Sequence, residues 1–459
     1  MSDRPPAADW PLPPDIEVII IDYLRDDKPT LVSCSLVCSR WLPRSRKHLF
    51  KDITIKEANH LTPDPLADFL RTVERSGSVN PEWAIGTHVK TFSLDGRLTD
   101  QKFNRGSPTA TCTLSVFRAL LAILPHLTSL CVTKFLILDD TPQGPDAENY
   151  HFPPFELDEL SVACCSGPTE DPHPLLALIC TFSRIGSLSV DRWGKWRPGP
   201  RPTFLQAPFS PPAVRCFIMN LVRDSVAERA LYALLARSPS VTDACLTRLS
   251  VNAENYDNVV MFVDFVNVAG AALRDIELRV RESDIRPDLL SGILLPTCTA
   301  LSSFVLSFQC RFDDSFLEDA EDTRDVLGLY TALLRTHRNV FVGLKVVRLE
   351  MQPAGESMHN ALARIAQDTF RERPEGAVHT VPPPEADQNR AVWEFLEDSL
   401  CDFPALERVE LVLYETSRPR GALTETAKAE LRGALGGRLP RLWASGTVQL
   451  VFETYVDDA

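Results

Sequence analysis

The sequence predicts an α/β fold in which a short helical N-terminal module precedes an irregular solenoid of strand–helix repeats. Apolar residues recur at helical spacing between residues 16 and 24. From residue 89 onward, an apolar residue is repeatedly followed by two more at +3 and +5, with helix-like segments between these triads. Alternation of short strands with helices is typical of a parallel sheet. At 459 residues, the chain is long enough for more than one domain.

The first predicted element is a helix that begins at the proline pair Pro13 and Pro14. Proline suits the first turn of a helix because its missing N–H has no intrahelical partner there. Asp15 complements the positive end of the helix dipole. One helical face would carry the apolar residues Ile16, Ile19, Ile20, Tyr23 and Leu24.

The second predicted helix begins near Pro29 and is apolar on more than one side. Its apolar residues are Leu31, Val32, Cys34, Leu36, Val37 and Cys38. A module of about 40 residues has too little interior to bury all of this surface. We therefore expect either a partner or the rest of the chain to cover it. In the second case, the module would be an ordinary helical cap on a larger domain.

Residues 12–50 resemble an F-box, in particular the F-boxes of basidiomycete fungi. The resemblance rests on the opening Leu12-Pro13, on Asp26-Asp27, on V-C-x-x-W at residues 37–41 and on the closing Leu49-Phe50. It implies docking of apolar helices on the Skp-family adaptor of a cullin-type ubiquitin ligase. The contact residues carried over from matching positions are Leu12, Pro13, Ile16, Ile20, Leu24, Leu31, Val37, Trp41 and Leu49.

The apolar triads resemble the L-x-x-L-x-L pattern of leucine-rich repeats. Ten triads begin at residues 89, 127, 157, 185, 214, 241, 273, 301, 344 and 406. Regular repeats of this family place Asn or Cys at +8, and only Cys165 fits that rule here. We therefore expect an irregular solenoid, with a generic α/β domain as the alternative. The predicted helices between triads are 114–124, 226–235, 259–268, 326–334 and 392–400.

These patterns divide the chain into four segments. Residues 1–10 are expected to be a disordered lead, 11–55 the F-box, 56–84 a helical linker, and 85–459 the leucine-rich-repeat-like domain that recognises a substrate.

Side chains alternate along a strand, so the residues between the core positions would share the opposite face of the sheet. In the later repeats this face carries charge, at Asp243, Asp275, Glu277, Arg279, Arg348, Glu350, Arg408 and Glu410. We expect these residues to select a protein substrate by charge. The alternative is that they pair with one another.

Composition argues against several other functions. The net charge of −14 argues against a general nucleic-acid binder, and no apolar run is long enough to span a bilayer. The 12 cysteines lack metal-ligand spacing, so we expect free thiols and no metal site. No catalytic or phosphate-binding motif is found, and we predict neither enzymatic activity nor a cofactor.

Three local features could contact partners, although each also has a structural explanation. The basic run at residues 40–51 would be the solvated face of a third helix. Trp193 and Trp196, which lie among Arg and Lys residues, would pack under their loop. The acidic run at 313–325 would be a solvated loop.

Taken together, the patterns predict a substrate-recognition subunit of a cullin-RING ligase of the SCF type, acting in the cytoplasm, the nucleus or both. Its partners would be the Skp-family adaptor, through it a cullin, and a protein substrate, with no nucleic acid and no membrane. The alternatives are an adaptor-bound scaffold outside a ligase and an enzyme with an unrecognised site.

Overall fold

A computed structural model gives a mixed α/β fold with a large parallel sheet of twelve strands, as the sequence predicts at this level. The structure describes residues 12–56, 64–79, 84–96, 110–140, 155–165, 167, 172–193, 210–220, 225–253, 256–280, 295, 297–311, 331, 333–354, 384–416 and 425–455. By its internal contacts the chain divides into two compact units, which are described separately.

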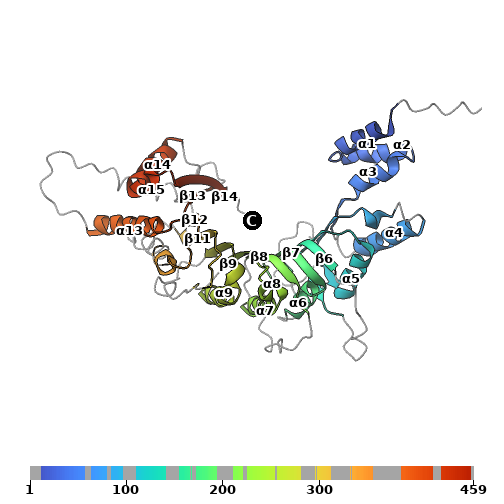
Figure 1. Ribbon diagram of the computed structural model, residues 1–459. Helices are drawn as coiled ribbons and strands as arrows, with labels where there is room; N and C mark the ends of the chain where they lie inside the picture. The colour runs from blue at the N-terminus through green and yellow to red at the C-terminus, as the bar shows by residue number, and fades with distance from the viewer. Residues whose placement is uncertain are drawn as a thin grey trace, which may run out of the picture. The chain divides into compact units, whose positions relative to one another are not determined.

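The first unit comprises Met1–Gly186 and Gly194–Ser210 and begins with three helices (Figure 1). Its helices are α1 (Pro14–Tyr23), α2 (Lys28–Val37), α3 (Trp41–Leu49), α4 (Pro65–Val79), α5 (Leu114–Ile123) and α6 (His173–Ile179), with a 3-10 turn at Ile85–Thr87. The main-sheet strands follow the order β1 (Asp52–Lys56), β2 (Thr91–Asp95), β4 (Ser129–Thr133) and β6 (Phe155–Ala163). A separate parallel pair joins β3 (Thr111–Thr113) and β5 (Leu136–Leu138).

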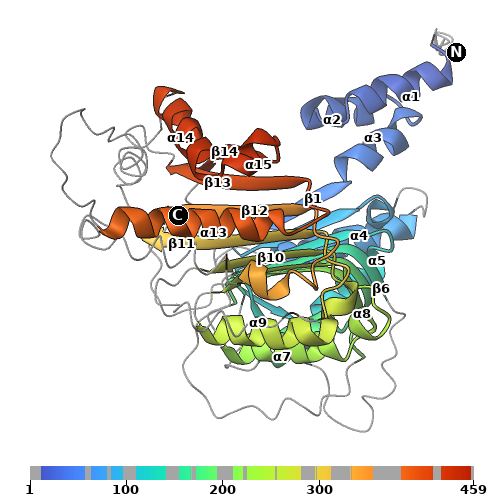
Figure 2. The ribbon, with the colours of Figure 1, turned by 60° about the vertical axis from the view of Figure 1, so that its left-hand side comes forward.

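The second unit comprises Ser187–Trp193 and Pro211–Ala459, so the division between the units falls within β7 (Phe182–Asp191). Its strands follow the chain order β8 (Ala213–Asn220), β9 (Arg248–Ala253), β10 (Asp275–Val280), β11 (Ser303–Arg311), β12 (Val346–Ala354), β13 (Arg408–Thr416) and β14 (Val448–Tyr455). Its helices are α7 (Ser225–Ala236), α8 (Pro239–Thr242), α9 (Tyr256–Ala269), α13 (Pro384–Cys401), α14 (Glu425–Arg438) and α15 (Pro440–Ala444), with a 3-10 turn at Gly270–Ala272. Helices α7 and α9 lie side by side (Figure 2).

The apolar triads form the core of both units. In the first unit the middle residues of three triads, Phe92, Leu130 and Leu160, pair in register across β2, β4 and β6 and are buried. In the second unit the buried row of middle residues is Phe217, Leu249, Ile276, Phe304, Val347 and Val409. Parallel strands bring equivalent positions side by side, which explains why one spacing recurs along the chain.

One predicted triad is wrong. Val241 and Ala244 lie in and just after the short helix α8, and Ala244 is exposed. Leu246 instead begins the triad, because Leu249 and Val251 pair with Phe217 and Met219 of β8. Pro239 in the first turn favours the helix that displaced the predicted strand.

The predicted boundary between the helical module and the remainder is also corrected. Residues 52–55, which the sequence places in the F-box segment, and Lys56, which it places in the linker, form strand β1 and pair with β2. Ile53 lies opposite Phe92, and Ile55 lies opposite Leu94. Only two residues therefore separate the end of α3 at Leu49 from the start of the sheet at Asp52. Helix α4 lies within the predicted helical linker.

The predicted helices at 114–124, 226–235, 259–268 and 392–400 correspond to α5, α7, α9 and α13. Residues 331 and 333–337 are helical, in agreement with the later part of the predicted helix 326–334. Cys165, the one residue that fits the +8 rule, is buried, and its Sγ lies 3.4 and 3.3 Å from the carbonyl oxygens of Val132 and Ala163, which share its S–H donor. Burial raises the pKa of this thiol to about 12.

Helices α7 and α9 enclose a buried carboxyl group. Glu228 of α7 accepts a hydrogen bond from the side-chain amide of Asn258 of α9, and both side chains are almost fully buried. Tyr232 stacks on Phe265 in the same layer, with ring centroids 4.9 Å apart. Burial raises the pKa of Glu228 to about 8, although the hydrogen bond from Asn258 opposes this shift. Glu228 therefore remains largely protonated in the folded protein at neutral pH.

His337 is a buried histidine with a structural role. Its Nε2 accepts a hydrogen bond from the Leu295 N–H at 2.7 Å, and its Nδ1 lies 2.8 Å from the Leu333 carbonyl oxygen. These two contacts fit a neutral ring that is protonated at Nδ1. The ring also stacks on Phe341. Burial lowers the pKa of His337 below its ordinary value of 6.5.

We expect His337 to reduce the stability of the protein in mild acid. Below pH 6.5 the unfolded chain binds a proton that the folded protein excludes, so the free energy of unfolding falls, by at most about 1.4 kcal/mol per pH unit. Urea denaturation at pH 7.5 and 5.5 should show a smaller loss for His337→Phe than for the wild type. Replacement of the exposed His126 by Gln is the control. Equal losses in wild type and His337→Phe would contradict the assignment.

Candidate functional site

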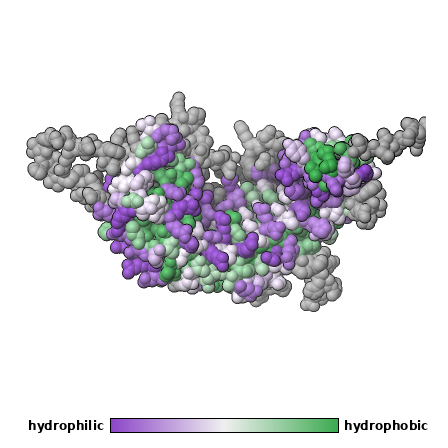
Figure 3. Space-filling view, turned by 45° about the horizontal axis from the view of Figure 1, so that its top comes forward, coloured by the Kyte–Doolittle hydropathy of each residue, from purple (hydrophilic) through white to green (hydrophobic). Residues whose placement is uncertain are grey.

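The first two helices expose most of their large apolar side chains. In the part of the chain that the structure describes, nine of the fifteen exposed large hydrophobic residues lie between residues 12 and 37. These nine, which we call the apolar face, are Leu12, Ile16, Val18, Ile19, Ile20, Tyr23, Val32, Leu36 and Val37. Figure 3 shows a continuous hydrophobic area over these N-terminal helices. Exposed apolar surface of this extent marks an interaction site.

The apolar stripe of α1 points away from the packed side of the helix. The buried positions of α1 are Glu17 and Ile21, whereas Ile16, Ile19 and Tyr23 are exposed. A helix that only capped a larger domain would place its most apolar stripe inward. Helix α1 instead buries the carboxylate of Glu17 and leaves three of its four isoleucines exposed.

Ion pairs between α1 and α3 hold the module in this arrangement. The Arg44 guanidinium makes two hydrogen bonds to Asp22, of which the Nε–Oδ1 bond measures 2.6 Å, and His48 Nε2 lies 2.7 Å from Asp22 Oδ1. Arg40 pairs with the buried Glu17 at 3.4 Å. The Arg44 guanidinium and His48 hold the pKa of Asp22 well below its usual range, although partial burial opposes them. Hydrogen bonds to charged groups are stronger than those between neutral groups.

Helix α2 begins at a capping aspartate. Asp27 accepts hydrogen bonds from the Thr30 N–H at 3.1 Å and from the Thr30 hydroxyl at 2.7 Å, which lowers its pKa. This cap and Pro29 in the first turn fix the start of the helix. Asp27, one of the two acidic residues that contributed to the F-box resemblance, thus stabilises the start of α2.

The predicted adaptor contacts fall into three groups. Leu12, Pro13, Ile16, Ile20 and Val37 are exposed, and Leu24, Trp41 and Leu49 are partly exposed. Leu31 is fully buried in the module itself, so this arrangement leaves it no surface for a partner. The adaptor contacts predicted from the F-box resemblance did not include Ile19, Tyr23 or Leu36, whose side chains are 61, 88 and 81 % exposed. The sequence could have indicated Ile19 and Tyr23, because both lie at helical spacing from Ile16 and so share its face of α1.

The predicted charged face lies on β9 to β14 of the second unit. Glu277 and Arg279 project from β10, Arg348 and Glu350 from β12, and Arg408 and Glu410 from β13. Asp275 lies at the start of β10. Asp243 is wrongly placed by the sequence, because it follows helix α8 rather than lying on a strand. Arg248 of β9 and Glu453 of β14, which were not predicted, complete the group.

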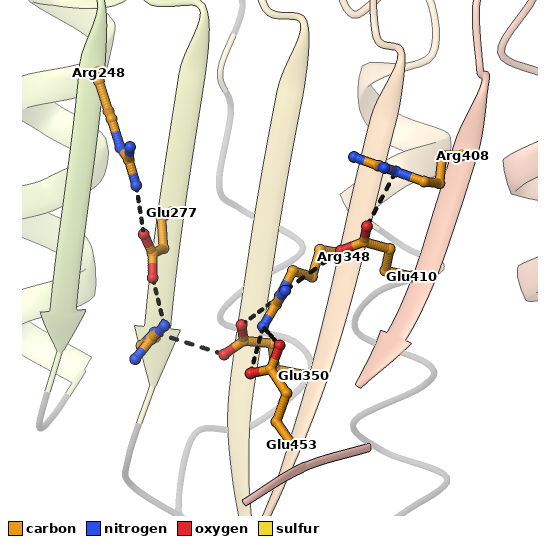
Figure 4. Close-up of polar contacts among 8 residues, drawn as sticks. Arg248, Glu277, Arg348, Glu350, Arg408, Glu410 and Glu453 are labelled. Atoms are coloured by element: carbon orange, nitrogen blue, oxygen red, sulfur yellow. Dashed lines mark hydrogen bonds and ion pairs between the residues drawn. The ribbon is translucent and has the colours of Figure 1, made fainter. Parts of the chain in front are cut away.

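These side chains form one connected network of four arginines and four glutamates, shown in Figure 4. Arg348 is its centre and pairs with Glu350 at 2.7 Å, Glu453 at 2.9 Å and Glu410 at 3.4 Å. The formal charges of the eight residues sum to zero. Six of the eight predicted residues therefore pair within this network, as the alternative expects, whereas Asp243 and Asp275 are not part of it. Selection of a substrate by charge stays a prediction.

The network extends across β11 because that strand contributes a small residue. Ser307 pairs in register with Arg279 on one side and with Glu350 on the other. Its short side chain leaves room for Arg279 Nε to reach within 3.6 Å of Glu350, two strands away. Arg279 also pairs with Glu277 at 2.8 Å, and Glu277 lies 3.7 Å from Arg248.

Comparison with known proteins adds no relative. No family model and no curated protein matches this sequence. The argument for function therefore rests on the two surfaces described above.

The remaining predicted features have structural roles or lie outside the described residues. In the basic run, Arg40, Arg44 and His48 form the ion pairs with α1, while Arg40, Lys47 and Lys51 are exposed, so the expected solvated face is seen in part. Trp193 is buried, as the packing explanation predicts. Trp196 and the acidic run at 313–325 fall outside the described residues.

Neither a metal-binding cluster nor a membrane-spanning helix is found in the described parts of the chain. Within the ranges given above, no cluster of three or more His, Cys, Asp or Glu side chains is arranged to hold a metal ion. No helix among the same residues combines the length and apolar character needed to cross a membrane.

Proposed function

We propose that this chain is the substrate-recognition subunit of a cullin-RING ubiquitin ligase of the SCF type. In this proposal, residues 12–50 are an F-box that docks on the Skp-family adaptor, and the leucine-rich-repeat-like α/β solenoid that follows presents a protein substrate. The chain contributes proximity and orientation, and the chemistry of ubiquitin transfer belongs to its partners.

The observation that carries the proposal is the exposed apolar face on α1 and α2. Complete burial of one such side chain contributes about 1.5–3 kcal/mol, so a partner that covers several of the nine gains enough to bind stably. Helices with exposed apolar anchors suit a groove lined by apolar residues. The resemblance of the same residues to an F-box favours the Skp-family adaptor as the partner.

The test is co-expression with the fungal Skp-family adaptor followed by size-exclusion chromatography. We expect wild type to form a stoichiometric complex and Tyr23→Asp/Leu36→Asp to lose it. Both side chains are more than four-fifths exposed, so the substitutions remove exposed apolar surface without disturbing the packing of the interior. The matched control is Val268→Asp/Val342→Asp, two exposed apolar residues of the second unit that should leave the complex intact.

A second variant separates the arrangement of the module from its surface chemistry. Asp22→Asn weakens the contacts of Arg44 and His48 with α1 but leaves the apolar face unchanged. We expect weaker adaptor binding in this variant because α1 is held less firmly. Failure of a folded wild-type protein to bind the adaptor would refute the proposal.

The same docking surface would also serve a scaffold that binds the adaptor outside a ligase. Recovery of the cullin and of ubiquitin-transfer activity with the complex would support the ligase role. An adaptor complex that lacks both would support the scaffold.

A further inference from the structure

The network on β9 to β14 is neutral in total, but three of its four arginines are more exposed than the carboxylates with which they pair. The side chains of Arg248, Arg279 and Arg408 are 54, 38 and 48 % exposed. Their carboxylate partners Glu277, Glu350 and Glu410 are 15, 1 and 14 % exposed. At these three positions the guanidinium groups are more exposed than the carboxylates that they contact. The fourth arginine differs, because Arg348 is 24 % exposed and its partner Glu453 is 38 % exposed. A molecule that approaches this face meets arginine first.

The buried carboxylates orient the arginines and leave them with unused donors. Within the described part of the chain, Arg408 pairs through Nε with Glu410 at 3.0 Å, and Arg248 pairs through one terminal nitrogen with Glu277 at 3.7 Å. An arginine side chain has five N–H donors in a fixed planar arrangement. Held in place by one pair, each of these guanidinium groups retains donors for a second carboxylate.

The strand register fixes the spacing of these arginines. Arg248 and Arg408 lie in one cross-strand row, separated by Asp275, Ser303 and Val346. Four strand spacings of about 4.8 Å separate them by about 19 Å. Arg279 lies on the same strand as Asp275, four residues further along, and so stands outside this row. An extended peptide of roughly six residues spans 19 Å, at about 3.3 Å per residue.

We propose that Arg248, Arg279 and Arg408 bind an acidic, extended segment of the substrate protein. This inference rests on the proposed function, because it names the class of substrate presented by the domain. The substrate of the proposed function is a protein, so the acidic ligand is a peptide segment and not a nucleic acid. Asp275 lies beside Arg248 in the cross-strand row, and its negative charge weakens the attraction of an acidic peptide to Arg248. We therefore expect Arg408 to contribute more to binding.

The test measures fluorescence anisotropy of labelled nona-glutamate on the purified full chain bound to the adaptor. We expect binding that weakens with salt, because charge dominates the contact. Tri-glutamate is too short to join Arg248 to Arg408 and should bind at least about ten-fold more weakly. Nona-lysine should not bind.

Neutral substitutions identify the residues responsible. Arg248→Gln/Arg408→Gln should weaken nona-glutamate binding at least about ten-fold, with Arg408→Gln alone the more harmful single change. Arg408→Lys retains the charge and should retain most of the binding. The matched control is Arg338→Gln, at an exposed arginine that pairs with Asp402 outside the strands and should have no effect.

Three results would each overturn the proposal: no binding of nona-glutamate to wild type, equal binding by wild type and the folded double variant, or tighter binding of nine-nucleotide single-stranded DNA than of nona-glutamate. Adaptor binding is recorded on the same samples by size-exclusion chromatography. An adaptor complex that forms normally while peptide binding fails refutes the acidic-substrate inference alone. A missing adaptor complex refutes the proposed function.

Discussion

Replacement of Arg348 by methionine should lower the free energy of unfolding of this protein by about 3–5 kcal/mol. Glu350 is almost completely buried, and its shortest ion pair is the 2.7 Å contact with Arg348. Without that guanidinium, Glu350 keeps only the longer 3.6 Å contact with Arg279 among the pairs of this network. A buried carboxylate that loses its closest cation bears a desolvation cost that is no longer offset.

Two further variants test this explanation by chemical denaturation. Arg348→Met/Glu350→Leu removes both charges and should recover much of the lost stability, because well-packed apolar residues can replace a buried ion pair. Lys345→Met breaks the exposed 2.8 Å pair with Glu407 just before the same strand and should cost no more than about 1 kcal/mol. A double variant less stable than Arg348→Met would show that burial of Glu350 is not the cause.

Replacement of Glu228 by glutamine should stabilise the protein at alkaline pH and have little effect near pH 4.5. The carboxyl group ionises near pH 4.5 in the unfolded chain and near pH 8 in the folded protein. Its contribution to stability is therefore complete below pH 4.5 and is lost as the pH rises through 8. Each pH unit in this window costs up to about 1.4 kcal/mol, which gives about 3–5 kcal/mol in all.

Glutamine has nearly the shape of a protonated glutamate and can still accept the hydrogen bond from Asn258. The check is the free energy of unfolding between pH 4.5 and 8.5 for wild type, Glu228→Gln and Asp257→Asn, an exposed position on α9. We expect the difference between Glu228→Gln and wild type to grow with pH, and the Asp257→Asn curve to follow the wild type. Parallel wild-type and Glu228→Gln curves would contradict the assignment.

The sequence predicted the core of the fold because burial and spacing are linked within a single strand. Phe92 and Leu94, or Phe304 and Leu306, lie two residues apart and must therefore share a face. The same rule failed at Val241, where a proline-initiated helix placed apolar residues at the strand spacing by coincidence. The triad rule also missed β14. Val448 and Leu450 occupy the +3 and +5 positions of a triad there, but its first position is Ser445, which is not apolar.

The ion-pair partners on the charged face could not be predicted from the sequence. Alternation identified Arg348 and Glu350 as facing away from the core, but the register between strands determines their partners. Arg348 and Glu453 are 105 residues apart, and nothing local to either residue predicts a 2.9 Å contact. The sequence could likewise not show whether the apolar stripe of α1 is buried or exposed, because the same spacing of apolar residues suits a helix that faces a core and one that faces a partner.

The order of the strands has a consequence for how the chain is made. Within each unit, every main-sheet strand pairs with the main-sheet strand that precedes it in the chain. Successive partners are separated by a few dozen residues, as from Phe92 to Leu130 or from Ile276 to Phe304. A strand that emerges from the ribosome therefore finds its pairing edge already synthesised, and closes only a short loop to reach it. We expect such a chain to assemble progressively from its N-terminus during translation, with the helical docking module complete before the last strands exist.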